Sequence, residues 1–126
     1  MNRRELAISD FFYDAVVREV IDGDTVRLDV DLGFRHWQHD MVIRLFGVNA
    51  PEKSTPAGKL AKQWLQGYLP VGGKVQLESI KDKADKYGNR WLGKISRFPS
   101  DTRTANEELL YAGHGLPWDG KGAKLV

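Results

Sequence analysis

The chain has 126 residues, a formal net charge of +2 and no cysteine. This length suits one domain with a single hydrophobic core, and a hydrophobic content of 41% argues against an intrinsically disordered chain. The absence of cysteine from the sequence excludes disulfides and thiolate metal sites.

The N-terminus, Met1–Arg4, resembles the charged region that opens a signal peptide, but polar and acidic residues interrupt the stretch that follows. The sequence holds no apolar run long enough to span a membrane. We therefore expect a cytoplasmic protein with no membrane partner. It forms one domain over residues 1–126, with flexible ends at 1–10 and 117–126.

A hairpin is predicted near the start of the domain. β-branched and aromatic residues dominate residues 11–21, and Thr25–Leu32 alternates between apolar and polar residues. The intervening Asp22-Gly23-Asp24 is typical of a tight turn, in which the glycine supplies a positive φ. The apolar face of the second strand consists of Val26, Leu28, Val30 and Leu32.

Residues 33–40 form a loop or a longer hairpin end, with Phe34 and Trp37 as its anchors. His36 and His39 invite a metal interpretation. No further ligands stand beside them at the spacing of a zinc site, so we do not expect them to bind metal.

The third strand carries the most unusual pattern in the chain. Met41–Glu52 reads MVIRLFGVNAPE, a nearly continuous apolar run with Arg44 in its middle and Glu52 just past its end. A guanidinium inside a buried strand is costly unless it is paired. The alternative is an edge-strand arginine that reaches solvent and a glutamate on the surface.

Two helices and two further strands complete the prediction. The first helix begins at Ser54 or Thr55 with Pro56 in its first turn, and the second begins at Thr104, which forms a capping box with Glu107. Strands are expected around residues 75–79 and 91–95. This order gives an α+β fold, a five-stranded OB-fold barrel with two helices. The buried face of the first helix is predicted from Leu60, Ala61, Trp64, Leu65, Tyr68 and Leu69.

Positive charge is concentrated between Lys81 and Arg97. This segment holds six basic and two acidic residues, a local charge of +4, which leaves −2 for the rest of the chain. Such asymmetry suits an anionic partner, although a solvated lysine-rich hairpin has the same composition.

Carboxylates gather where the predicted strands end, at Asp22, Asp24 and Glu52. Oxygen ligands of this kind hold hard cations, and the forked donors of Arg44 and Arg90 suit a phosphate. A cation, two arginines and a base together suffice for phosphodiester hydrolysis. The plain alternative for Asp22 and Asp24 is a turn with no ligand.

Three segments resemble the motifs of the staphylococcal nuclease (thermonuclease) family and occur in the family's order, and a fourth segment resembles the family's second helix. They are IDGDT at 21–25, RLFGVNAPE at 44–52, DKYGNR at 85–90 and NEELLYAGHG at 106–115. The resemblance implies a calcium-dependent endonuclease that cleaves DNA and/or RNA and leaves 3′-phosphate and 5′-hydroxyl ends. We expect a monomer with no organic cofactor.

The resemblance also assigns the metal ligands. Asp24 matches a direct calcium ligand and Asp22 an outer support. Asn49 matches a second ligand, joined by the carbonyl of Ala50. The family's pattern has an aspartate where this chain has Asn49, so we expect weaker calcium binding because the site has one negative charge fewer.

The remaining site residues follow in the same way. Arg44 matches the arginine that contacts the phosphate, and Glu52 matches the residue assigned as general base. Arg90 matches a second arginine that assists the leaving oxygen, although Asn89 shifts it by one position. Lys86 and Tyr87 match residues that hold a terminal phosphate.

Two further departures from the family's pattern are visible: a shortened loop after Glu52, and an early end that leaves no room for a third helix.

Members of the family that have lost catalytic residues suggest the main alternative, an inactive OB-fold that binds nucleic acid or a protein partner. An oligosaccharide-binding OB-fold module is a third possibility, although the basic segment does not suit it.

Overall fold

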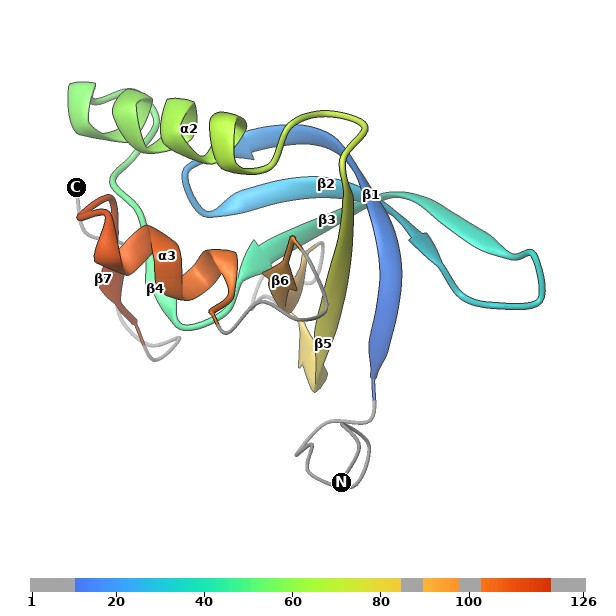
Figure 1. Ribbon diagram of the computed structural model, residues 1–126. Helices are drawn as coiled ribbons and strands as arrows, with labels where there is room; N and C mark the ends of the chain where they lie inside the picture. Colours follow the sequence, from blue (N-terminus) through green and yellow to red (C-terminus); the bar gives the residue numbers. More distant parts are fainter. Residues whose placement is uncertain (1–10, 85–89, 98–102, 119–126) are drawn as a thin grey trace.

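The computed structural model describes residues 11–84, 90–97 and 103–118. Five strands close into a barrel in the order β1-β2-β3-β6-β5 (Figure 1). Neighbouring strands are antiparallel except β3 and β6, which run parallel. This closure, with a helix after the third strand, is the OB-fold topology, so the predicted fold is confirmed. The barrel strands are β1 (Phe12–Asp22), β2 (Thr25–Asp31), β3 (Trp37–Leu45), β5 (Lys74–Ala84) and β6 (Trp91–Ser96).

The barrel interior is filled by the inward face of each strand. In β2, Val26, Leu28 and Val30 are fully buried, as their alternation predicted. Leu32 is the exception: it lies just past the strand and is 47% exposed. The predicted apolar face was therefore one residue too long, because pairing with β1 stops at Val30.

The β2–β3 hairpin extends beyond the barrel, at the end away from the β1–β2 turn (Figure 1). Phe34, at its tip, is 97% exposed and has a positive φ of 56°. The prediction that Phe34 anchors this segment was wrong, because the hairpin carries the side chain away from the core.

Helix α2 (Pro56–Tyr68) follows the third barrel strand. Thr55 caps it, accepting a hydrogen bond from the Gly58 amide, and Pro56 occupies its first turn. Ala61 and Leu65 are buried on the predicted face, but Leu60 is 57% exposed. The predicted buried face of this helix was therefore too wide by one residue, Leu60.

Gly23 in the β1–β2 turn lies directly against α2. It does not have the positive φ that the turn composition suggested. A Cβ at this position would lie 2.7 Å from the Cβ of Ala61 and 2.8 Å from that of Ala50. The glycine is needed for close approach, and the proximity holds the turn against both α2 and the segment after the third strand.

A second small layer lies beside the barrel. Helix α3 (Ala105–Tyr111) begins with the predicted capping box of Thr104 and Glu107. The two-residue strands β4 (Val48–Asn49) and β7 (Leu116–Pro117) pair with each other. Residues 117 and 118, predicted as the start of a flexible tail, thus lie against β4, whereas 119–126 fall outside the described residues. Among the described residues, no helix is long and apolar enough to span a membrane.

Asn106 on α3 fastens this layer to the barrel. Its side chain is buried, accepts from the Ile95 amide and donates to the carbonyls of Phe46 and Gly93. These bonds satisfy backbone groups where β3 ends beside β6.

Candidate active site

Asp24 links the first predicted motif to the second. Only 1% of it is exposed, and the hydroxyl of Thr25 donates to its Oδ1 at 3.1 Å. The amide of Ala50 donates to its Oδ2 at 2.9 Å. Ala50 lies 26 residues further along the chain, just after the third predicted strand. This bond therefore fixes the segment after that strand against the Asp-Gly-Asp turn.

Arg44 faces Asp24 because of the strand register. Thr25 and Arg44 are opposite each other in the β2–β3 pair, so the arginine lies beside the turn. Its Nη2 is 3.6 Å from Asp24 Oδ2 and donates to Asn49 Oδ1 at 3.1 Å. Its Nη1 donates to the Leu45 carbonyl at 3.2 Å. The guanidinium is 4% exposed and paired, so the alternative of an edge-strand arginine in solvent is wrong.

Trp118 covers this guanidinium. The Cζ of Arg44 lies 4.0 Å from the centre of a Trp118 ring, within the range of a cation–π contact. Pairing of β7 with β4 places the tryptophan there, together with a hydrogen bond from its amide to the Gly47 carbonyl. Sequence reasoning missed Trp118, since nothing in a Gly- and Lys-rich segment ties a tryptophan to a strand some 70 residues earlier.

Asp22 and Asn49 complete what we call the Asp24–Arg44 cluster, which consists of Asp22, Asp24, Arg44, Asn49 and Ala50. Asp22 accepts from the Asp24 amide at 3.1 Å, a bond within the turn. Asn49 is 2% exposed, and its Nδ2 is buried without a hydrogen-bond partner in the described structure. Such an orphaned donor is unusual in a folded protein.

The other predicted site residues are less closely placed. Glu52 follows Ala50 by two positions and is partly buried, and its backbone carbonyl accepts from Thr55 at the start of α2. Arg90 is partly buried immediately before β6. Lys86 and Tyr87 lie outside the described residues, as does Asn89.

The cluster does not fit a divalent cation in this arrangement. Asp24 Oδ2 and Asn49 Oδ1, the two side-chain oxygens that the resemblance assigns to calcium, both face the same guanidinium nitrogen. Ala50 contributes its amide to Asp24. Within 11–84, 90–97 and 103–118, no group of three histidine, aspartate or glutamate side chains could hold a metal ion.

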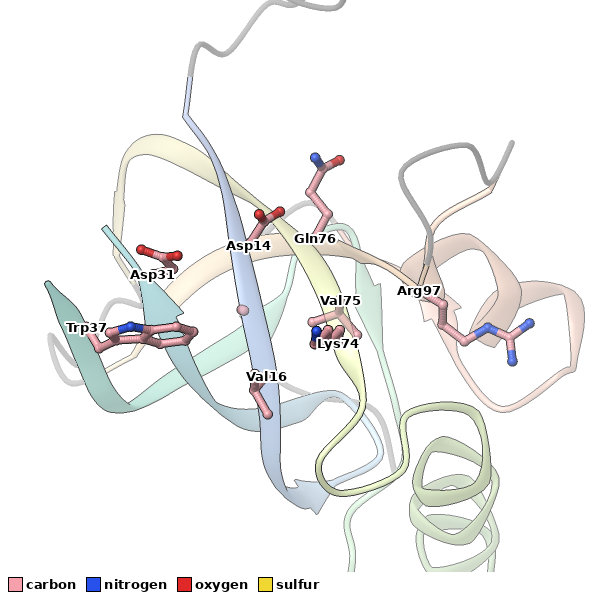
Figure 2. Close-up of a pocket in the computed structure, with 9 residues that line it drawn as sticks. Asp14, Val16, Asp31, Trp37, Lys74, Val75, Gln76 and Arg97 are labelled. Carbon is pink, nitrogen blue, oxygen red and sulfur yellow. The ribbon is translucent and has the colours of Figure 1, made fainter. Parts of the chain in front are cut away.

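A separate pocket of about 560 Å³ lies at the opposite end of β1 (Figure 2). It collects residues from β1, β2, β3 and β5, together with Arg97 just past the end of β6, and none of them was predicted for the site. Two carboxylates and two cations are among them, so the pocket shows no preference for a polyanion. Its lining consists of Asp14, Ala15, Val16, Asp31, Trp37, Lys74, Val75, Gln76 and Arg97.

Comparison with known proteins gives one informative relationship. No model of a known protein family matches the chain. The thermonuclease of Staphylococcus intermedius is 36% identical over 88 residues, which is 62% of this chain and 48% of that protein. The chain is a distant relative of the thermonucleases. It spans about half the length of the relative that it matches.

The fold and the distant thermonuclease relationship agree with the sequence resemblance.

Proposed function

We propose that this protein is a nuclease that hydrolyses phosphodiester bonds of DNA or RNA. The observation that carries the proposal is the contact of Asp24 in the first motif with Arg44 and Ala50 in the second, where Arg44 also donates to Asn49. A structural turn has no need for a buried guanidinium from another strand, whereas a phosphate site does. The thermonuclease relative supports the same reaction class.

Each predicted residue has a role in this proposal. Arg44 and Arg90 bind the phosphate and offset the negative charge that grows on it during hydrolysis. Glu52 orients and activates the attacking water. Lys86 and Tyr87 hold a terminal phosphate. For Arg44 to reach a substrate, the ring of Trp118 must first leave its guanidinium, since the side chain is otherwise buried.

The resemblance extends the proposal to calcium dependence, endonucleolytic cleavage, 3′-phosphate and 5′-hydroxyl products and action as a monomer. Asp24, Asn49 and the Ala50 carbonyl are the ligands that it names, with Asp22 as outer support. In the arrangement described above, both of these side-chain oxygens face the guanidinium of Arg44.

A second candidate function has an observation in its favour. The buried, covered state of Arg44 suits a nuclease-like OB-fold that binds nucleic acid or a protein without cutting. In that case the cluster is a structural ion pair.

Digestion of single- and double-stranded DNA and of RNA tests the proposal. We expect cleavage with calcium, none with EDTA, and recovery when calcium is restored. End-labelling of the fragments should find 3′-phosphates. Intact substrate under both conditions would reject the nuclease function, and equal cleavage with EDTA would reject the calcium requirement alone.

A further inference from the structure

The guanidinium of Arg44 lies where the resemblance would place a cation. Its Nη2 is 3.1 Å from Asn49 Oδ1 and 3.6 Å from Asp24 Oδ2. A divalent ion shared by these two oxygens would have to approach the same atoms that this nitrogen already faces. The arginine and the ion therefore compete for one position.

The cluster is already well satisfied with the arginine in place. Asp24 accepts from Thr25 and Ala50 in addition to facing the guanidinium, and Arg44 also donates to the Leu45 carbonyl. The positive charge of Arg44 balances the negative charge of Asp24. An ion that enters must replace contacts that already exist.

Trp118 holds the arginine in this position. Its ring lies 4.0 Å from the guanidinium carbon, on a segment fixed by β4–β7 pairing. Asn49 belongs to β4, so the strand that presents one oxygen also pairs with the segment that covers the arginine.

We propose that Arg44 is the resident counter-ion of the Asp24–Arg44 cluster, and that a divalent cation binds there only when the guanidinium leaves from under Trp118. Arg44 thus disfavours metal binding in the closed arrangement, in addition to its proposed contact with phosphate. The inference relies on the proposed function only for the choice of calcium as the ion.

A consequence can be measured without any nuclease activity. If only a fraction of molecules is open, the apparent affinity for the ion falls by that fraction. A closed population of about nine in ten would weaken binding about tenfold. Removing the arginine should abolish this penalty, and removing its cover should reduce it.

The experiment is calorimetric titration of calcium into the whole protein and into Arg44→Met, Trp118→Ala and the double variant. We expect affinity to rise about tenfold for R44M. For W118A we expect a rise of about two- to fivefold, the size of one cation–π contact. In the double variant W118A should add nothing, because its effect passes through Arg44.

A substitution at Trp118 distinguishes displacement of the Arg44 guanidinium from simple repulsion between Arg44 and the calcium ion. Trp118→Ala alters no charge, so a rise in affinity for W118A that disappears in the R44M background supports displacement. Trp37→Ala removes a tryptophan at the far hairpin and should leave calcium affinity unchanged. Unchanged affinity in W118A, or an equal rise with and without Arg44, would overturn the inference.

A second measurement covers the case in which R44M fails to fold. Calcium should change the fluorescence of Trp118 in the unmodified protein, with Trp118→Phe as the blank, because the ring loses its cation. Calcium binding without that change would contradict the inference. Calcium binding by no folded variant would contradict it too, whereas the digestion assay judges the nuclease proposal separately.

Discussion

Asn49 is an uncharged side chain within the Asp24–Arg44 cluster, whose charges come from Asp22, Asp24 and Arg44. Its amide oxygen accepts from Arg44, while its Nδ2 is buried with no hydrogen-bond partner among the described residues. An aspartate at this position would keep the acceptor and add one negative charge to those of Asp22 and Asp24, against the single positive charge of Arg44. The site would then attract a cation more strongly.

Asn49→Asp should therefore tighten calcium binding, by about tenfold for one additional nearby charge partly screened by solvent. Calorimetry at fixed ionic strength measures the change. Because asparagine and aspartate have nearly the same shape, the unmodified protein is the matched control. Equal calcium affinity in the two proteins would count against a cation site at this cluster.

Breaking the buried pair of Arg44 and Asp24 should lower the stability of the fold. Arg44→Met leaves the Asp24 carboxylate buried without its cation. We expect the free energy of unfolding to fall by about 3–5 kcal/mol. Urea denaturation measures this change.

The double variant Asp24→Asn with Arg44→Met is the control, because it removes both charges. It should recover part of the loss, since no unpaired buried charge remains. Additive losses in the two single variants and the double variant would mean that the pair is not coupled.

At the scale of elements, the β1–β2 turn and helix α2 depend on their close approach at Gly23. A methyl group there would lie 2.7 Å from Ala61 and 2.8 Å from Ala50. Gly23→Ala should lower the free energy of unfolding by about 1–3 kcal/mol through overpacking. It should also displace Asp24, which follows directly in the turn.

Gly67→Ala is the matched control, a glycine-to-alanine change on helix α2 itself. Nothing lies within 4 Å of a Cβ at that position, and alanine favours the helical conformation. This change should raise the free energy of unfolding by about 0.5–1 kcal/mol. If both variants are equally stable in thermal unfolding, the proposed contact between turn and helix is incorrect.

In the projecting β2–β3 hairpin, the titratable carboxylate of Asp29 accepts a hydrogen bond across the two strands. The Asp40 amide donates to its carboxylate at 3.0 Å and lowers the pKa of Asp29 below its ordinary value of 3.8, helped by His39 and Arg18 against the opposing effect of desolvation. Asp29 therefore stabilises the fold above pH 3.8. This contribution is lost as the pH falls through the lowered pKa.

Asp29→Asn should remove that pH dependence. The unmodified protein should be more stable than the variant at pH 7, and the difference should shrink as the pH falls below 3.8. Unfolding by urea between pH 7 and pH 3 measures the difference. A gap that stays constant over this range would show that the Asp29 charge does not contribute.

For the whole molecule, the sequence predicts the barrel well because its signals are local. Alternation in β2, the Thr55 cap and the Thr104 capping box depend on neighbouring residues alone. Closure of the barrel depends instead on the long-range pairs β1–β5 and β3–β6, which were expected only because the order of elements matches the OB-fold. The errors at Leu32 and Leu60 concern the ends and edges of elements, where tertiary packing decides exposure.

The candidate site depends on contacts that the sequence does not display. Motif resemblance brings Asp24, Arg44 and Asn49 to attention, but it cannot show that one guanidinium nitrogen of Arg44 faces both side-chain oxygens. Trp118 reaches the site only through pairing of two short strands far apart in sequence. Asn106 likewise bonds to backbone groups in three separate segments.

The proposed function requires this molecule to cleave nucleic acid and not merely to bind it. The most direct test follows one labelled DNA strand with calcium, with the unmodified protein and Glu52→Gln at concentrations where both bind it. We expect the unmodified protein to cut the strand. The cleavage rate of Glu52→Gln should be lower by a factor of about 100. Binding without cleavage by the unmodified protein, or equal cleavage by both, would contradict this account.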